Sequence, residues 1–122
     1  MAKIKELQKK YELSKDDFWN LTGNVWIILH DAVEKIANKE NIIFQLPTLL
    51  RNDKDSVAFL GTAILKDNEI WATGEASLSN CKVPYPFAMA EKRLKDRLTL
   101  KLINAYEYGI YSDVESDQFK KQ

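Results

Sequence analysis

Cysteine and histidine are almost absent from this chain of 122 residues: Cys81 is the single cysteine and His30 the single histidine. One cysteine cannot form a disulfide framework, and the two residues together are too few for a dedicated zinc site. We therefore expect no metal, and a half-buried structural role for both side chains. A reducing, cytoplasmic setting fits this composition best.

Long apolar runs, internal repeats and Gly/Ser linkers are lacking as well. No window approaches the roughly 18 apolar residues of a membrane span, so we expect no membrane partner. The lack of a linker favours one domain over residues 1–122, with 45% hydrophobic residues to form its core. Net charge is lacking too, because 18 basic residues balance 18 acidic ones, and only the distribution of the charges is informative.

Apolar residues recur at helical spacing over residues 1–39. A short first helix is indicated by Ile4, Leu7 and Tyr11. Ser14 and Asp17 are typical of a second helix start, which Thr22-Gly23-Asn24 interrupts. A longer helix ending near Ala37 is predicted from the apolar stripe of Val25, Ile28, Leu29, Ala32 and Ile36.

Residues 41–78 predict a three-stranded antiparallel sheet. A first strand stops at Pro47, the charged run RNDKDS forms a turn, and a tight hairpin closes on Asp67-Asn68. One hairpin face is apolar and small in its middle, so a helix can lie close to it; it carries Val57, Phe59, Gly61, Ala63, Leu65, Ile70, Ala72, Gly74, Ala76 and Leu78. The other face is a candidate binding or assembly surface: Leu60, Thr62, Ile64, Trp71, Thr73 and Glu75. Alternatively, Trp71 and Ile64 only pack beneath the charged turn.

A basic amphipathic helix over residues 86–106 completes the predicted fold, with Pro86 as its first residue. Its apolar side should cover the small-residue face of the hairpin through Phe87, Ala90, Leu94, Leu98, Leu102 and Ala105. Residues 110–122 predict an acidic tail anchored by Tyr111 and Phe119. The fold class is thus α+β: N-terminal helices, a three-stranded antiparallel sheet and a C-terminal helix on one face.

Positive charge gathers on this last helix, where Arg93, Arg97 and Lys101 recur every four residues. The simplest interpretation is a solvated helix face, with Lys92 and Lys95 further round. A row of cations also suits a phosphodiester chain, and Tyr85 and Trp71 could stack on bases, which favours single-stranded nucleic acid. A second apolar strip of Met89, Leu100 and Ile103 indicates contact with another subunit, hence a homo-oligomer.

Three segments together resemble the single-strand annealing recombinases of phages: GTAILKDNEIWATGEASLSN, YPFAMAEKRLKDRLTLKLI and GIYSDVESD. The resemblance covers residues 57 to about 117 and implies a β-β-β-α core in which a Lys-Arg pair, here Lys92 and Arg93, holds the backbone of single-stranded DNA or RNA. It further implies rings or filaments, a host cytoplasm and no cofactor. Arg97 and Lys101 are added by the helical stripe alone.

Two other functions stay open. The predicted order of helices and strands also suits a double-stranded-RNA-binding module, and the open sheet face also suits a structural oligomer or small-ligand cavity. An enzyme is disfavoured, because the carboxylates that could hold magnesium for a nuclease follow no recognised spacing: Asp31, Glu34, Glu75, Glu91 and Asp96. We therefore predict no catalytic residues.

Overall fold

The computed structural model describes residues 2–77, 79–80 and 85–119. Leu78 and Cys81, which the sequence analysis singled out, lie outside the described residues. Within the described part the fold is α+β, as predicted, with three α-helices and two sheets of three and four strands. None of these helices combines the length and the apolar run that crossing a bilayer requires.

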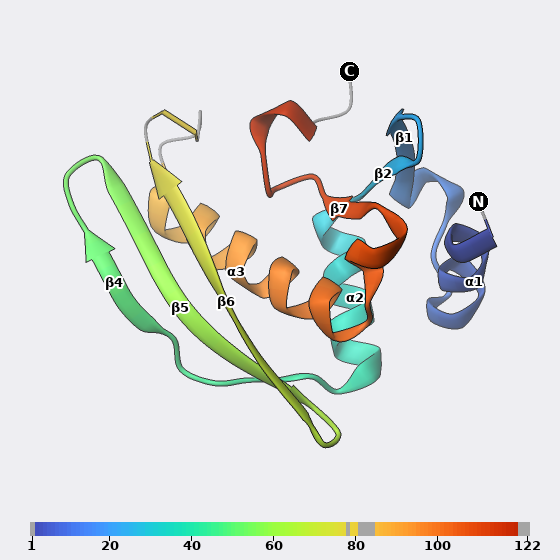
Figure 1. Ribbon diagram of the computed structural model, residues 1–122, viewed down its shortest axis with the longest axis horizontal. Coiled ribbons are helices and arrows are strands. Elements are labelled where there is room, and N and C mark those ends of the chain that lie inside the picture. The colour runs from blue at the N-terminus through green and yellow to red at the C-terminus, as the bar shows by residue number, and fades with distance from the viewer. Residues whose placement is uncertain (1, 78, 81–84, 120–122) are drawn as a thin grey trace.

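The elements are labelled in Figure 1. The helices are α1 (Ala2–Tyr11), α2 (His30–Glu40) and α3 (Pro86–Leu102), with 3-10 turns η1 (Lys15–Asp17), η2 (Ala105–Tyr108) and η3 (Asp117–Phe119). The strands are β1 (Phe18–Thr22), β2 (Val25–Ile28), β3 (Ile43–Phe44), β4 (Thr48–Asn52), β5 (Ser56–Leu65), β6 (Asn68–Ser77) and β7 (Ile110–Ser112).

The N-terminal residues hold one of the two short helices predicted there. α1 buries Ile4, Leu7 and Tyr11, which confirms the first helix. Ser14 and Asp17 do form a capping box, but the turn that it caps, η1, ends after three residues and the chain continues as β1. A good cap alone does not extend a helix, because the following residues are fixed by their pairing with β2.

The predicted longer helix is wrong in its first part. Residues 25–28 form β2, and α2 begins at His30. The segment Val-Trp-Ile-Ile is β-branched and aromatic, and it lies between β1 and β7 with Ile27 and Ile28 fully buried. A strand buried on both faces lacks the alternation that would distinguish it from a helix, so its residues also fit a helical stripe.

The start of the predicted acidic tail is a strand. β7 pairs parallel with β2, with Trp26 opposite Ile110 and Ile28 opposite Ser112. Gly109 precedes it with a φ of +73°, and its carbonyl accepts a hydrogen bond from the Trp26 amide at 2.8 Å. The C-terminal segment is therefore built into the N-terminal sheet (Figure 1).

The second sheet has four strands because the segment after Pro47 pairs with β5 as β4. The hairpin turn is Lys66-Asp67, with Leu65 opposite Asn68, and not Asp67-Asn68 as predicted. Every pair is thereby shifted by two residues, and Lys66 takes a φ of +56°. A shift by an even number leaves each side chain on its predicted face.

α3 lies against the small-residue face of the hairpin, behind β5 and β6 in Figure 1. A Cβ placed on Gly74 would lie 2.6 Å from the Leu94 Cβ and in contact with the Ala90 carbonyl. A Cβ on Gly61 would meet the Leu94 side chain at 2.6 Å. The two glycines therefore set how closely α3 approaches the sheet.

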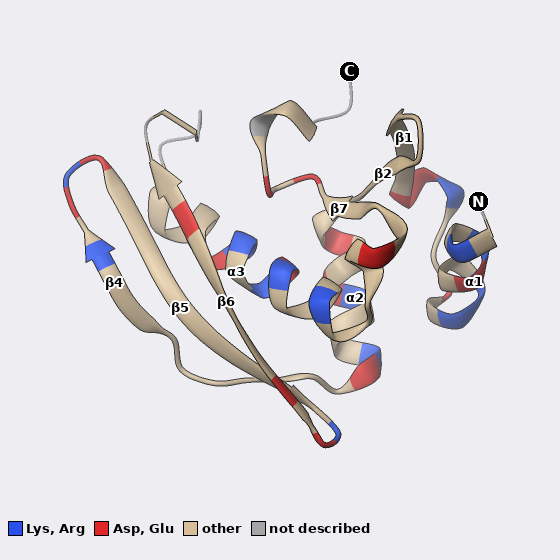
Figure 2. Cartoon of the chain, in the orientation of Figure 1, with Lys and Arg blue, Asp and Glu red and all other residues tan. Residues whose placement is uncertain are grey.

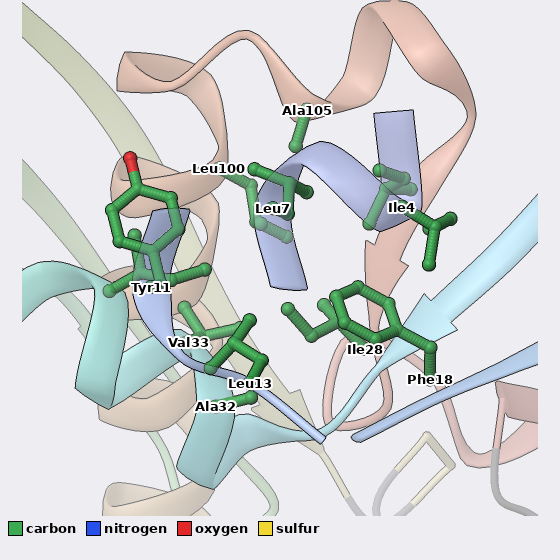
Figure 3. Packing of buried hydrophobic residues seen from close by; sticks show 12 residues of the cluster. Ile4, Leu7, Tyr11, Leu13, Phe18, Ile28, Ala32, Val33, Leu100 and Ala105 are labelled. Atoms are coloured by element: carbon green, nitrogen blue, oxygen red, sulfur yellow. The ribbon is translucent and has the colours of Figure 1, made fainter. Parts of the chain in front are cut away.

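The largest core cluster joins α1, α2, β2 and α3 (Figure 3). Leu100 and Ala105 enter it from the C-terminal end of α3 and from η2, and both are fully buried. Leu94, Leu98 and Leu102, on another side of α3, belong to the cluster beneath the hairpin. α3 is thus shared by both clusters and is the element that positions the sheet against the N-terminal part.

Candidate functional site

The cation row of α3 runs along the outer edge of β6. Arg93, Arg97 and Lys101 donate to successive outward carbonyls of that strand: to Glu75 at 2.9 Å, to Thr73 at 2.8 Å and to Trp71 at 2.8 Å. Four residues of helix and two of strand both advance about 6 Å, so the rows stay in step. Figure 2 shows the positive residues recurring along α3 behind β6. The row therefore covers a strand edge that would otherwise be open.

Arg93 is buried, with 2% of its surface exposed. Besides Glu75, its guanidinium bonds the Val114 carbonyl at 2.6 Å and both the side-chain and backbone oxygens of Asn80 at 3.0 and 2.8 Å. The helical spacing predicted Arg93 in an accessible row with Arg97 and Lys101, and this placement on the surface is wrong. Four hydrogen bonds to protein oxygens make Arg93 a tie between α3, β6 and the C-terminal segment.

The rest of the row opens on a groove of about 410 Å³ between β6, α3 and the C-terminal segment. Its lining brings together Trp71, Arg97 and Lys101, three of the six residues predicted to bind nucleic acid. Trp71 is 64% exposed, and the Lys101 ammonium lies 5.4 Å from the centre of its ring. The groove therefore offers an aromatic surface beside positive charge.

Two tyrosines form the opposite wall of this groove. The rings of Tyr106 and Tyr111 lie 5.3 Å apart at 46°, and the Tyr111 ring also packs on Phe119 at 5.8 Å. Tyr111 appeared in the sequence analysis only as an anchor of the tail, and Tyr106 not at all. Local sequence patterns do not predict their position beside α3, because it depends on the turn at Gly109 and on the pairing of β7 with β2.

Carboxylates neutralise one of the two cations of the groove, Arg97. Arg97 forms a two-pronged ion pair with Glu75 at 2.8 and 3.0 Å, and its Nε lies 3.4 Å from Glu115. The hydrogen bonds that Arg97 donates to Glu75 raise the pKa of Arg97. Burial and the neighbouring Glu115 raise the pKa of Tyr106, so the phenol stays protonated and donates to Glu115 at 2.5 Å.

The remaining predicted contacts lie elsewhere. Tyr85 is 63% exposed just before α3, and Lys92 is exposed on the helix, but neither lines the groove. The predicted subunit strip is used within the chain: Leu100 is buried in the core of Figure 3, Ile103 packs on the same cluster, and Met89 packs beside Val57. Burial in the folded monomer leaves Leu100 no surface for a second subunit, so this prediction is wrong for Leu100.

Exposed apolar side chains gather instead around β3 and β4. Ile43, Leu46, Leu49 and Leu50 are 60, 96, 46 and 56% exposed. β4 pairs with β5 on one side, and all five of its residues are exposed.

A second polar centre joins α2, α3 and β7. The His30 Nδ1 lies 2.9 Å from both Asp96 oxygens, the Ser112 hydroxyl donates to Asp96 at 2.5 Å, and the His30 Nε2 pairs with Glu34 at 2.7 Å. Burial raises the pKa of Asp96 to about 6, and the hydrogen bond that His30 makes to Asp96 raises the pKa of His30. The expected structural role of a half-buried His30 is met by these hydrogen bonds, but the side chain is buried more deeply than expected, with 9% of the residue exposed.

The Ser112 hydroxyl donates to the Asp96 carboxylate, which also contacts the His30 imidazole, so the carboxylate joins the two side chains. Among the residues that the structure describes, no three His, Cys, Asp or Glu side chains are placed to hold a metal ion. The geometry supports a structural tie between three elements.

Comparisons of the chain with family models, with curated proteins and with solved structures give no match. The resemblance to annealing recombinases therefore stays a prediction. What the geometry supplies is a groove with an exposed indole, two tyrosines and two cations, which suits a ligand that carries both flat rings and negative charge.

Proposed function

We propose that this protein binds single-stranded nucleic acid in the groove beside β6, without catalysing a reaction. The observation that carries the proposal is the meeting of Trp71, Tyr106 and Tyr111 with Arg97 and Lys101. Bases can stack on the aromatic rings while the cations contact the phosphates, an arrangement that needs no cofactor and little sequence preference. Annealing of complementary strands, which the sequence resemblance implies, is the corresponding activity.

A single strand suits the groove better than a duplex. Trp71 presents an open ring, and only an unpaired base can stack on it. The more enclosed apolar cavity near Phe44, Phe59 and Leu98 holds about 100 Å³, below the roughly 300 Å³ at which small-ligand pockets begin, so this cavity does not favour the small-ligand alternative. The module for double-stranded RNA remains the alternative, and competition with duplex RNA tests it.

The test is the fluorescence anisotropy of a labelled single-stranded oligonucleotide over a range of salt concentrations. Trp71→Ala should weaken binding about 5- to 150-fold, since stacking contributes about 1–3 kcal/mol per base. Lys101→Gln should weaken it less and reduce the salt slope by about one. Lys54→Gln, which removes an exposed lysine from the β4–β5 turn, is the control of equal charge change.

Binding by both variants at the wild-type affinity would refute the proposal. If Lys101→Gln and Lys54→Gln lose the same amount of affinity, the binding reflects attraction by overall charge and not a site in the groove. A stronger response to duplex than to single-stranded competitor would favour the double-stranded alternative. Stopped-flow mixing of complementary strands, with and without the protein, then measures annealing.

A further inference from the structure

Arg97 has two carboxylate partners that differ in how firmly they are held. Glu115 is 9% exposed and accepts hydrogen bonds from the Tyr106 hydroxyl and, at 2.7 Å, from the Ser112 amide. Glu75 is 45% exposed at the edge strand, and its ion-pair partner is Arg97. One carboxylate is therefore fixed by the C-terminal segment, while the other is free to move into solvent.

The Glu75 carboxylate pairs with Arg97 in the same two-pronged way that a phosphate group can. Its oxygens lie 2.8 Å from Nη1 and 3.0 Å from Nη2 of Arg97, which is the parallel two-pronged pairing that guanidinium groups form with carboxylates and phosphates alike. The Thr73 carbonyl holds Nη1 from the strand side at 2.8 Å, so the guanidinium is oriented before any ligand arrives.

We infer that the Glu75 carboxylate occupies the phosphate subsite of the groove, and that a nucleic-acid phosphate binds by displacing it from Arg97. This inference rests on the proposed function and names the regulation of that site. Glu75 acts as a built-in competitor: it keeps Arg97 oriented and neutralised, and weak or isolated anions do not displace it. A polyanion whose neighbouring groups contact Trp71 and Lys101 at the same time does.

The consequence is opposite to that of an ordinary structural ion pair. If Glu75 only positioned Arg97, its loss would weaken binding, because the guanidinium would lose its orientation. If Glu75 competes with phosphate, its loss strengthens binding, because the exchange no longer breaks an ion pair and no carboxylate repels the ligand. The sign of the change in affinity therefore decides between the two roles.

The experiment compares Glu75→Gln with Glu69→Gln in the oligonucleotide assay. Glu69 is exposed on the same strand near the turn, and its replacement by Gln removes the same charge. We expect Glu75→Gln to raise the affinity about three- to tenfold and Glu69→Gln to change it less than twofold. Glu75→Asp is the second variant: it keeps the charge, but its shorter side chain cannot keep both hydrogen bonds to Arg97, so it also raises the affinity.

Failure of this inference is distinguishable from failure of the proposed function. If the wild type binds, and Trp71→Ala and Lys101→Gln weaken binding, but Glu75→Gln does not strengthen it, only the competitor role is refuted. Equal gains in Glu75→Gln and Glu69→Gln refute it too, because they reflect net charge. If neither the wild type nor Glu75→Gln binds the oligonucleotide, the proposed function and the inference fail together.

Discussion

Single residues of the cation row have different tasks, although they recur at regular spacing on one helix. Arg93 is enclosed and bonds four oxygens of β6, Asn80 and the C-terminal segment. Arg97 is intermediate, with its guanidinium shared between β6 and two carboxylates. Lys101 is exposed and bonds one carbonyl. Structural importance therefore falls, and availability to a ligand rises, from the start of the row to its end.

Arg93→Lys tests the structural role of Arg93 without changing the charge. A lysine ammonium cannot reach oxygens on three segments at once, so buried acceptors lose their partners. We expect the free energy of unfolding to fall by about 2–4 kcal/mol in urea denaturation. Lys92→Arg, at the exposed neighbouring position, should change it by less than about 0.5 kcal/mol. Wild-type stability of Arg93→Lys would show that the observed bonds do not hold the fold.

α3 and the β5–β6 hairpin fit each other in the spacing of their polar groups and in the close packing of their backbones. The helix repeat of four residues and the strand repeat of two keep the cations opposite the carbonyls. Beneath them, Gly61 and Gly74 allow the backbone of α3 to come close to the hairpin. The edge of the sheet and the wall of the groove thus depend on the same close approach.

Gly74→Ala and Gly61→Ala should differ in cost because different atoms oppose the new methyl group. At position 74 it meets the backbone of α3, at the Leu94 nitrogen and the Ala90 carbonyl, so the helix itself must shift. At position 61 it meets the end of the Leu94 side chain, which can change rotamer. We expect Gly74→Ala to lose about 2–3 kcal/mol and Gly61→Ala less. Thermal melts of the two variants measure the order, and equal losses would contradict this packing.

At the scale of the whole molecule, the buried centre of His30, Asp96 and Ser112 fixes α2, α3 and β7 relative to one another. The His30 amide also donates to Asp113 at 2.9 Å, which ties the start of α2 to the residue after β7. The two core clusters meet at α3, so this centre helps to set the position of the groove between β6 and the C-terminal segment.

The buried centre predicts a pH-dependent stability. Burial raises the pKa of Asp96 from 3.8 to about 6, and the pKa of His30 is raised by its bond to Asp96. A raised pKa means that the folded state holds protons more tightly than the unfolded state, so the contribution is complete at low pH and is lost as pH rises. We expect Asp96 to lower the free energy of unfolding as the pH rises from about 4 to 6, by ~3 kcal/mol at most, and His30 to lower it further above about pH 6.5.

Urea denaturation over this pH range measures the effect. Asp96→Asn removes the titrating carboxyl and the hydrogen bond that raises the pKa of His30, so its stability should vary less with pH than that of the wild type. Asp31→Asn, at an exposed position beside His30, should keep the wild-type slope. Parallel profiles for Asp96→Asn and the wild type would assign the pH dependence to other groups, of which Asp113 also has a raised pKa because of burial.

Local sequence patterns are sufficient to predict the features that belong to single elements. Helical spacing gave α1 and the start of α3, and strand alternation gave the two faces of the β5–β6 hairpin. The regular spacing of Arg93, Arg97 and Lys101 placed them on one side of a helix because an α-helix repeats every 3.6 residues. The sequence predicts Trp71, Arg97 and Lys101 as binding residues, and all three line the same groove.

The contacts that these residues make depend on long-range packing. Strand β2 and strand β7 are identified by pairing between segments about 80 residues apart, and no local pattern contains that partner. The same long-range packing buries Arg93 and Leu100. It also brings Tyr106 and Tyr111 into the groove with Trp71. Spacing fixes the side of an element on which a residue lies, whereas the element packed against that side determines whether its charge meets solvent or protein oxygens.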